Sequence, residues 1–429
     1  MVTIIIKGWN RTMNEALNTA GIPDPYSLDL DAIDVSDPHL FEADVHGEYF
    51  ARLRKEAPVH YCASSAFGPF WSVTKFDDIM TVDKDFQLYS SEPAIVIGDN
   101  PDDFVLENFI GMDPPKHDGQ RKAVEGAVSP ASLAKLEPLI RQRVQNILDG
   151  LPIGETFDWV DRVSIELTTQ MLATLFDFPF ERRRKLTYWS DMTTASPEVA
   201  GDDSVSQEER QAALNECLDE FTVLWNERVN KDPGDNFDFI TMMAHSEATR
   251  NMKPMEFLGN LVLLIVGGND TTRNSISGGV LELNRNPGEY DKLRAHPELI
   301  PKMVPEIIRY QTPLMHMRRL ATADTTLNGQ HIKKGDKVVM WYVSGNRDGD
   351  KIEKPDEFII DRANPRNHLS FGFGIHRCMG NRLGEMQLRV LWEEIMQRFS
   401  MVEVIEEPTR LKSNFVHGIT RMPVRLHPL

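Results

Sequence analysis

A single cysteine near the C-terminus lies in a segment suited to presenting a thiolate. The stretch HLSFGFGIHRCMGNRLGEMQ, residues 368–387, sets Cys378 among glycines and basic residues. After it Met379, Leu383 and Val390 recur at helical spacing, which predicts a helix beginning at or just after the cysteine. Unpaired N–H groups at a helix N-terminus lower a thiol pKa and stabilise the thiolate, the form that attacks carbon or binds metal. The pattern therefore favours a reactive or metal-binding cysteine over an inert buried one.

A second unusual stretch is LGNLVLLIVGGNDTTRNS, residues 258–275. A long apolar helix normally avoids Gly267 and Gly268, which cost about 1 kcal/mol each relative to alanine. It also does not bury an acid such as Asp270 without a reason. One interpretation is a helix kink with an aspartate cap. The other is a functional role that offsets these costs.

The elements that would position these residues are mainly helical. The chain has 429 residues, 41% of them hydrophobic and 26% charged, which is typical of a folded globular protein with one large core. From Pro130 to Arg250 apolar residues recur at spacings of three and four, and short strand-like runs lie near both ends. The sequence therefore predicts a mainly α fold, a single large helical domain with small peripheral β-sheets. Residues 91–115 and 194–207 are predicted as long loops, which often serve as lids or substrate entrances.

Charge and cysteine usage exclude several classes of protein. The formal net charge of -18 argues against nucleic acid or an anionic membrane surface as the main partner. Cys62, Cys217 and Cys378 are too few and too scattered for a disulfide framework, and no Cys-x-x-Cys pair is present. No apolar run near the N-terminus is long enough for a membrane anchor, and no signal-peptide layout follows it. We therefore expect a cytoplasmic protein without a membrane anchor.

The cysteine segment resembles the haem-binding loop of cytochrome P450, whose form is Phe-Gly-x-Gly-x-His-x-Cys-x-Gly. The chain matches every fixed position of that form, with Phe371, Gly372, Gly374, His376, Cys378 and Gly380. The resemblance implies the P450 fold and haem b (iron protoporphyrin IX) as the cofactor. It also implies that Cys378 is the axial thiolate ligand of the haem iron.

The resemblance continues in positions away from the cysteine. Glu306 and Arg309 in EIIR match the family's Glu-x-x-Arg, with Arg362 as the third, structural partner. The residues that match haem-propionate positions are His117, Arg121, Arg319 and His376, and Arg318 is an alternative to Arg319. Cations are the expected partners of two buried carboxylates.

The resemblance also gives the glycine-bearing helix a role. In the family the glycines, here Gly267 and Gly268, open a groove for dioxygen, and the acid–alcohol pair, here Asp270 and Thr271, delivers protons to it. The sequence GNDTTRN departs from the commoner form and is most similar to soluble bacterial P450s that hydroxylate medium-chain alkanes and fatty acids at the terminal carbon. Arg273, beside this groove, has no explanation in the sequence.

The resemblance runs from residue 36 to 429, the expected haem domain, and leaves residues 1–35 as an N-terminal extension. By family position the substrate pocket is expected to be walled by residues 91–110 and by six apolar side chains. These six are Leu263, Val266, Leu314, Met315, Phe415 and Val416. No lysine or arginine is evident in those segments for a substrate carboxylate, which favours neutral, linear, apolar substrates.

The implied function is a class I bacterial P450 monooxygenase that oxidises the terminal C–H of medium-chain alkanes or fatty acids with O2. The expected electron donors are a [2Fe-2S] ferredoxin and an NAD(P)H-dependent ferredoxin reductase, because the chain shows no flavin or iron–sulfur domain of its own. Within the class, the alternative is a hydroxylase of terpenes or other small lipids. From other classes, a haem-thiolate peroxygenase and a haem gas sensor remain, although the first does not need Asp270 and Thr271 and the second normally carries an output domain.

Overall fold

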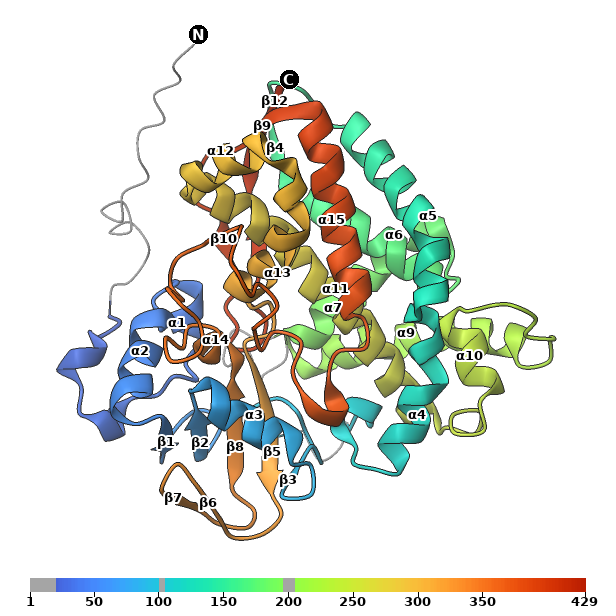
Figure 1. Ribbon diagram of the computed structural model, residues 1–429. Helices are drawn as coiled ribbons and strands as arrows, with labels where there is room; N and C mark the ends of the chain where they lie inside the picture. Colours follow the sequence, from blue (N-terminus) through green and yellow to red (C-terminus); the bar gives the residue numbers. More distant parts are fainter. Residues whose placement is uncertain (1–20, 100–104, 196–204) are drawn as a thin grey trace.

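The computed structural model describes residues 21–99, 105–195 and 205–429. The parts of the two expected loops at 100–104 and 196–204, and residues 1–20 of the expected extension, lie outside the described residues. Helices dominate the described chain (Figure 1). The α-helices are α1 Pro38–Glu42, α2 His46–Glu56, α3 Phe76–Lys84, α4 Lys116–Val124, α5 Pro130–Asp149, α6 Ile165–Leu175, α7 Arg184–Thr194, α9 Gln207–Arg228, α10 Phe239–His245, α11 Pro254–Arg285, α12 Pro287–Ala295, α13 Ile300–Gln311, α14 Tyr342–Gly345 and α15 Asn381–Arg398.

The strands form small separate sheets, as the sequence predicts. The largest has five strands in the order β1 Val59–Cys62, β2 Phe70–Val73, β8 Lys337–Trp341, β5 His316–Ala321 and β3 Tyr89–Ser90. A second sheet has the order β4 Thr156–Asp158, β12 Pro423–Pro428 and β9 Phe399–Val404. Two hairpins remain, β6 Thr325–Leu327 with β7 Gln330–Ile332 and β10 Thr409–Arg410 with β11 Ile419–Arg421. The prediction of a mainly α fold with small peripheral sheets is confirmed.

Helix α11 runs through the middle of the helical layer and organises the core (Figure 1). It packs against α6, α7, α13 and α15. Its glycines fall where these neighbours come close: a Cβ at Gly268 would lie 2.7 Å from Leu172 Cδ2, and one at Gly279 would lie 2.8 Å from Ile307 Cδ1. At Gly267 nothing lies within 4 Å of the added Cβ, so this face of the helix borders open space. A side chain at Gly268 or Gly279 would therefore clash with a neighbouring helix, whereas one at Gly267 would project into the open space.

The N-terminal part of the described chain packs into the sheet region. Ile33 and Val35 are buried in one apolar cluster with Phe41 of α1 and Trp341 of β8. These contacts join the end of the expected N-terminal extension to the body of the protein. The domain boundary at residue 36 stays a prediction.

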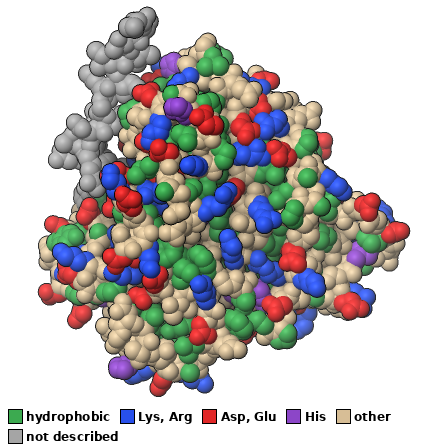
Figure 2. Space-filling model, in the orientation of Figure 1, with side chains coloured by type: hydrophobic (Ala, Val, Ile, Leu, Met, Phe, Trp, Pro, Cys, Tyr) green, Lys and Arg blue, Asp and Glu red, His purple; other side chains and the backbone are tan. Residues whose placement is uncertain are grey.

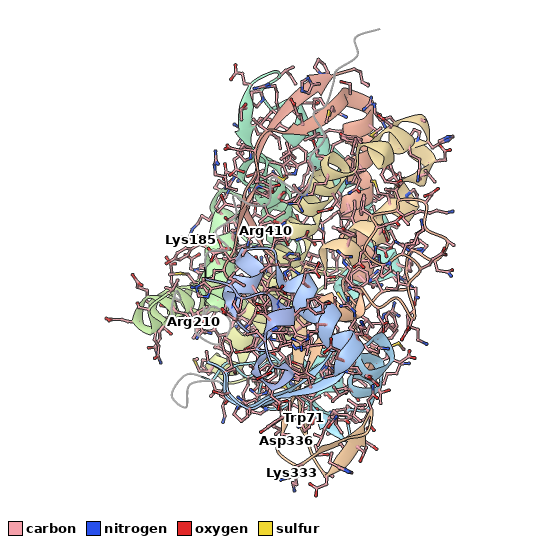
Figure 3. The ribbon with its side chains drawn as sticks, turned by 90° about the vertical axis from the view of Figure 1, so that its left-hand side faces the viewer. Trp71, Lys185, Arg210, Lys333, Asp336 and Arg410 are labelled. Atoms are coloured by element: carbon pink, nitrogen blue, oxygen red, sulfur yellow. The ribbon has the colours of Figure 1, made fainter. Side chains whose placement is uncertain are left out.

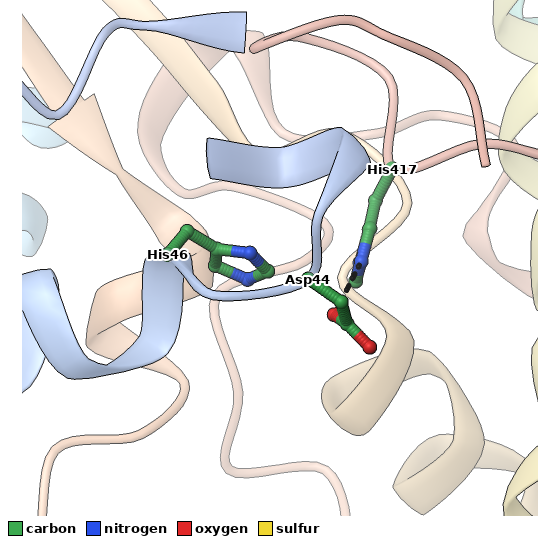
Figure 4. Close-up of side chains that lie close together, drawn as sticks. All are labelled: Asp44, His46 and His417. Carbon is green, nitrogen blue, oxygen red and sulfur yellow. Dashed lines mark ion pairs between the residues drawn. The ribbon is translucent and has the colours of Figure 1, made fainter. Parts of the chain in front are cut away.

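A polar cluster joins the start of the described chain to its end (Figure 4). Asp44, which precedes α2, accepts a hydrogen bond from Arg410 Nη2 at 2.6 Å, and its other oxygen lies 3.9 Å from His417 Nε2. Burial alone would raise the pKa of Asp44, but the charge of Arg410, the hydrogen bond to His417 and the charge of Arg285 together outweigh it and hold the pKa well below its usual range. His46 completes the group. Because an arginine already neutralises the carboxylate, the cluster is a tether between distant segments.

Among the described residues, no helix combines the length and the apolar character needed to cross a bilayer.

Acid should destabilise this fold because three buried histidines are held neutral. Burial lowers the pKa of His46 to about 3, of His316 to about 4 and of His368 to about 3. The His316 tautomer is fixed, since Nδ1 donates to Asn414 O at 2.9 Å while Nε2 accepts from Ile97 N at 3.1 Å. An unfolded histidine binds its proton at a pKa of about 6.5. Above that pH the histidine is neutral in both states and costs the fold nothing. As pH falls toward the folded pKa, only the unfolded state gains the proton, so the free energy of unfolding falls.

We expect the free energy of unfolding to fall by about 1.4 kcal/mol per pH unit for each such histidine below pH of about 6.5. Urea unfolding at a series of pH values measures the slope. His316→Gln, which cannot titrate, should reduce the slope by the contribution of one histidine, about 1.4 kcal/mol per pH unit. A slope unchanged by this substitution would contradict the conclusion that His316 is held neutral in the folded state.

Candidate functional site

One large cavity, of about 610 Å³, lies between α11 and the segment that leads into α15. Its lining is mostly apolar. Cys378 opens into it, together with Phe371, Gly372 and Gly380 from the same segment. The lining also includes residues 92–96 and 105–110, which belong to the predicted 91–110 wall, and continues to Gly111 and Met112 just beyond it.

The backbone before Cys378 is folded back tightly. Gly372 and Gly374 have φ of +62° and +67°, in the left-handed region that favours glycine. A Cβ at Gly374 would lie 2.5 Å from the carbonyl oxygen of Asp83. Cys378 N then donates to Phe371 O at 2.8 Å, which closes the loop. The glycines of the motif are therefore required by the turn that directs the sulfur to the cavity.

The electrostatics of Cys378 differ from the sequence expectation. The sulfur is reachable from the cavity but lies deep below the molecular surface, and this burial raises the pKa of the thiol. The N–H groups of Gly380 and Asn381, at the start of α15, and the charges of Arg121 and Arg377 lower it, but to a smaller extent. The prediction of a lowered thiol pKa is wrong for the protein alone, because desolvation outweighs the helix N-terminus. A bound cation at the sulfur would supply the missing stabilisation.

Two histidines beside the cavity have ring nitrogens without partners. Both nitrogens of His376, and Nε2 of His117, are buried without a hydrogen bond among the described residues. The two rings pack edge to face with centroids 4.4 Å apart, and His376 lines the cavity whereas His117 lies behind it. Burial, with Arg319 and His117 nearby, lowers the pKa of His376 to about 2. Such orphaned groups require an external partner.

The arginines near these histidines also border the cavity. Arg319 lines it and pairs with Asp83 at 2.8 Å, while Arg121 lines it and donates to Arg377 O at 2.6 Å. Arg318 instead donates to Gly98 O at 2.9 Å and to Asp99 at 2.8 Å, away from the lining. Of the two alternatives, Arg319 therefore lies at the site. Two arginines, two histidines and a cavity-facing thiol form a set that fits the carboxylates and iron of haem.

On α11 the predicted acid and alcohol point in different directions. Thr271 lines the cavity with Gly267 and Gly268, and its hydroxyl donates to Gly267 O at 2.8 Å. Asp270 does not line the cavity: it is fully buried and accepts a hydrogen bond from Ser190 of α7 at 2.9 Å. The sequence predicts the two residues as an acid–alcohol pair; on the helix their side chains lie about 100° apart, with Thr271 toward the cavity and Asp270 toward α7.

Arg273 is explained by this arrangement. Its guanidinium donates to Asp270 Oδ1 and, through both terminal nitrogens, to Asp191 Oδ1 at 3.0 Å. Asp191 lies on α7 with its side chain 52% exposed. Burial raises the pKa of Asp270, and Arg273 opposes that rise. Arg273 thus joins a buried acid to one that contacts solvent.

Four of the six predicted wall residues line the cavity, namely Leu263, Val266, Leu314 and Phe415. Met315 and Val416 do not, and both predictions are wrong. Met315 is fully buried among the residues that pack around Trp341, and Val416 is fully buried in a small cluster behind Phe415. Each is the chain neighbour of a lining residue, Leu314 or Phe415, but its own side chain is buried in the protein interior. Met317, two residues after Met315, lines the cavity in its place.

A buried ion cluster near the cysteine segment contains Glu306, Arg309 and Arg362. The Glu306 carboxylate accepts from Arg309 at 2.8 Å through both oxygens and from Arg362 Nε at 3.0 Å. Ile359 N adds another hydrogen bond at 2.9 Å. Arg309 also donates to Asn346 O at 2.8 Å, and Asn346 contacts Ser370 at 2.9 Å, just before the haem-loop motif. The trio therefore supports the segment that carries Cys378.

Asp83 is a site residue that the sequence does not reveal. Its carboxylate accepts from Arg319, from Tyr342 Oη at 2.9 Å and from Phe373 N at 2.7 Å. It therefore fixes both a cavity-lining arginine and the glycine turn. No local pattern marks it, because its partners lie more than 200 residues away in the chain.

Comparison with known proteins agrees with this geometry. Residues 107–426 match the family model "Cytochrome P450". The solved structure of CYP153D17 from Sphingomonas sp. PAMC 26605 is similar, with 48% identity, a TM-score of 0.87 and coverage of 93% of this chain and 100% of that one. Linalool 8-monooxygenase of Pseudomonas putida is 36% identical over 92% of this chain and 99% of its own. Methyl-branched lipid omega-hydroxylase of Mycobacterium tuberculosis H37Rv is 31% identical over 89% of this chain and 91% of its own.

With a cavity-facing cysteine, unpartnered histidines and a family match over most of its length, this chain belongs to the cytochrome P450 family of haem-thiolate monooxygenases, and its cofactor is haem b.

Proposed function

We propose that this P450 hydroxylates the terminal carbon of medium-chain alkanes or fatty acids. The observation that carries the proposal is the shape and chemistry of the cavity wall beside Cys378. Leu263 and Val266 of α11, with Leu314 and Phe415 from two loops, present branched or aromatic side chains with few rotamers. Such a wall is suited to admitting a chain end while covering the methylene groups behind it.

The named activity of one relative supports this proposal. One is a lipid omega-hydroxylase, and the CYP153 structure has the higher identity. Linalool 8-monooxygenase, at 36% identity, favours the second candidate, a hydroxylase of terpenes or other small lipids. The peroxygenase and gas-sensor alternatives are less suited to a helix that presents Thr271 to the cavity and anchors an acid beside it.

Haem, when bound, supplies the chemistry that activates O2 and oxidises a C–H bond. We propose Cys378 as its axial ligand, and Arg121, Arg319, His117 and His376 as the residues that hold its propionates. The orphaned ring nitrogens of the two histidines gain partners in that arrangement. Phe371, Gly372 and Gly380 border the cofactor, since they line the cavity beside the sulfur.

Thr271 and Asp270 are proposed to move protons into the cavity. The Thr271 hydroxyl lies one helical turn after Gly267, whose open face leaves room for dioxygen. Ser190 and Arg273 hold the Asp270 carboxyl on the side of α11 that faces α7. A proton that moves from Asp270 to Thr271 must therefore pass from that side of α11 to the side that faces the cavity. Asp191, half exposed at the other end of Arg273, contacts solvent and provides the entrance for that proton.

A [2Fe-2S] ferredoxin with an NAD(P)H-dependent reductase is proposed as the electron donor. An acidic ferredoxin is attracted only by a local basic surface, because the net charge of the chain is -18. Lys and Arg side chains gather along the middle of the face under which α4 and α15 lie (Figure 2). Lys116, Lys122, Arg377 and Arg382 are exposed on or near these helices. A cytoplasmic location stays a prediction.

Product analysis tests the terminal position. A methyl C–H bond is stronger than a methylene C–H bond, so terminal oxidation requires the wall to hide the methylenes. We expect mainly 1-alkanols or ω-hydroxy acids, measured by gas chromatography after turnover of linear substrates. Leu263→Ala should shift product toward the penultimate carbon by about tenfold, since one such contact discriminates by roughly 1–3 kcal/mol.

Met315→Ala is the matched control, because it removes an apolar side chain near the cavity that does not line it. Its product ratio should stay unchanged. Predominantly internal alcohols from the unmodified enzyme would refute terminal hydroxylation and leave the family assignment intact.

A further inference from the structure

We propose that Asp83 is a positioning residue that shares Arg319 with a haem propionate and thereby lowers the reduction potential of the haem. The inference rests on the proposed binding of a propionate by Arg319 and goes beyond terminal hydroxylation. Asp83 is the penultimate residue of α3, borders the cavity and is 3% exposed. Its charge opposes the function of this end of the cavity, because a carboxylate repels the carboxylates of the cofactor.

The contacts of the Asp83 carboxylate place it between the arginine and the cysteine segment. Oδ1 accepts from Arg319 Nη2 at 2.8 Å, and Oδ2 accepts from Tyr342 Oη at 2.9 Å and from Phe373 N at 2.7 Å. Arg319 Nη1 donates to the backbone oxygen of Arg318 at 2.9 Å, and the guanidinium still borders the cavity. A propionate would therefore share an arginine whose charge is already partly neutralised.

The glycine turn packs so closely on Asp83 that the carboxylate is fixed beside the site. A Cβ at Gly374 would lie 2.5 Å from Asp83 O, and one at Gly372 would lie 3.3 Å from Asp83 Oδ2. Lys84, the next residue of α3, has its ammonium 5.6 Å from the centre of the Phe373 ring. The end of α3 is thus held against the segment that leads to the cysteine.

The charges at this end of the cavity do not balance when haem is present. Arg121 and Arg319 border the cavity there and match the two propionates. His376 adds no charge, because burial and the charge of Arg319 lower its pKa to about 2. Lys84 is exposed, so solvent screens its charge. Beside two arginines and two propionates, Asp83 therefore adds one unbalanced negative charge.

An unbalanced negative charge favours the oxidised cofactor. Ferric haem carries one more positive charge than ferrous haem, so a nearby carboxylate stabilises the ferric form more strongly. The effect is larger where water is excluded, and Asp83 is buried. Asp83 thus lowers the reduction potential below the value that Arg121 and Arg319 alone would give.

Spectroelectrochemical titration of the haem-loaded protein measures this potential. Asp83→Asn removes the charge and keeps an oxygen that can accept from Phe373 N or Tyr342. Its potential should be more positive. The ratio of ferrous to ferric haem at a fixed applied potential should rise by about tenfold, the effect of one charge over roughly 10 Å at an effective dielectric constant of about 20. Because burial raises the pKa of Asp83, although Arg319 opposes that rise, the titration is run at a pH of about 8 to favour the ionised carboxylate.

Two other aspartates provide matched controls that should leave the potential unchanged. Asp348 is 4% exposed and accepts from Phe76 N at 3.0 Å at the opposite end of α3, outside the cavity lining. Asp336 accepts from Trp71 Nε1 and from Lys333 N, both at 2.9 Å, at the outer end of the sheet region (Figure 3). Asp348→Asn matches the loss of a buried carboxylate, and Asp336→Asn matches the change in net charge.

Two further variants keep the inference testable if Asp83→Asn folds poorly. Asp83→Ser also removes the charge and should shift the potential in the same direction. The double variant Asp83→Asn with Arg319→Gln removes both members of the buried pair and should return the potential toward the unmodified value. It should also release haem to an excess of apomyoglobin about tenfold faster than Asp83→Asn, because a propionate loses a charged hydrogen bond.

An unchanged potential in the Asp83 variants, or an equal shift in Asp348→Asn, would overturn the inference and leave Asp83 a structural role. Failure of the propionate assignment looks different. The double variant would then release haem no faster than Asp83→Asn, and the inference would fall with the role of Arg319 on which it rests.

Discussion

Cys378→Ser should abolish monooxygenase activity and the thiolate-type Soret band of the reduced carbon monoxide complex. The sulfur is the only group in the described chain that combines a position at the cavity with the chemistry of a haem-thiolate ligand. A serine hydroxyl has a far higher pKa and does not form the corresponding anion near neutral pH. The absorbance spectrum reports the ligand directly, so the result does not depend on coupling to redox partners.

Cys217→Ser is the matched control for this experiment. Cys217 is fully buried on α9 in the apolar core and does not line the cavity. Its replacement should leave the spectrum unchanged even if it lowers stability. A Cys378→Ser protein that kept the thiolate-type spectrum would refute the ligand assignment.

Glu306→Gln should lower the free energy of unfolding by about 3–5 kcal/mol, the usual cost of removing one partner from a buried ion pair. Glu306 is fully buried, and Arg309 is fully buried beside it. Burial alone would raise the pKa of Glu306, but the hydrogen bonds and charge of Arg309, with Arg362, outweigh it and keep the pKa below its usual value. Without the carboxylate, two guanidinium groups remain against each other.

Chemical denaturation of the two proteins measures this loss. Haem content should fall with it, because Arg309 also holds the backbone at Asn346, which contacts the residue before the haem loop. Glu298→Gln provides the control, since Glu298 is an exposed acid whose partner is His296. Equal stability of Glu306→Gln and Glu298→Gln would show that the buried trio does not support the fold.

The sequence predicts the parts of this protein that local pattern determines. Helical periodicity identifies the helical middle, and the haem-loop motif carries its own turn because Gly372 and Gly374 have positive φ. Of the trio at Glu306, the pair Glu306 and Arg309 is also predictable, since the two residues are one turn apart on a helix, whereas Arg362 follows only from the family resemblance. In each case the residues that interact, or the conformations they need, are close in the chain.

The sequence does not predict features that depend on the direction in which a side chain points or on contacts with distant segments of the chain. The adjacent pair Leu314 and Met315 is predicted as wall together, but only the first faces the cavity. The sequence predicts Asp270 and Thr271 as a pair but not the partners of the acid, which are Ser190 of α7 and Arg273 on its own helix. A periodic pattern indicates which residues share one face of an element, but it does not indicate which other element packs against that face. The raised thiol pKa of Cys378 has the same origin, because burial follows from the whole fold.

The tether at Asp44 has a consequence for how the protein is made. Asp44 needs Arg410, 366 residues further along the chain, and strand β2 pairs in parallel with β8, so these elements find their partners only after most of the intervening chain has been made. Such contacts between distant parts of the chain form late and slow the overall rate of folding. Until then α1, α2 and the first two strands expose apolar side chains such as Phe41 and Phe50, whose burial requires Trp341. During synthesis these apolar side chains therefore stay exposed longer than those whose partners are close in the chain, which favours their binding by chaperones.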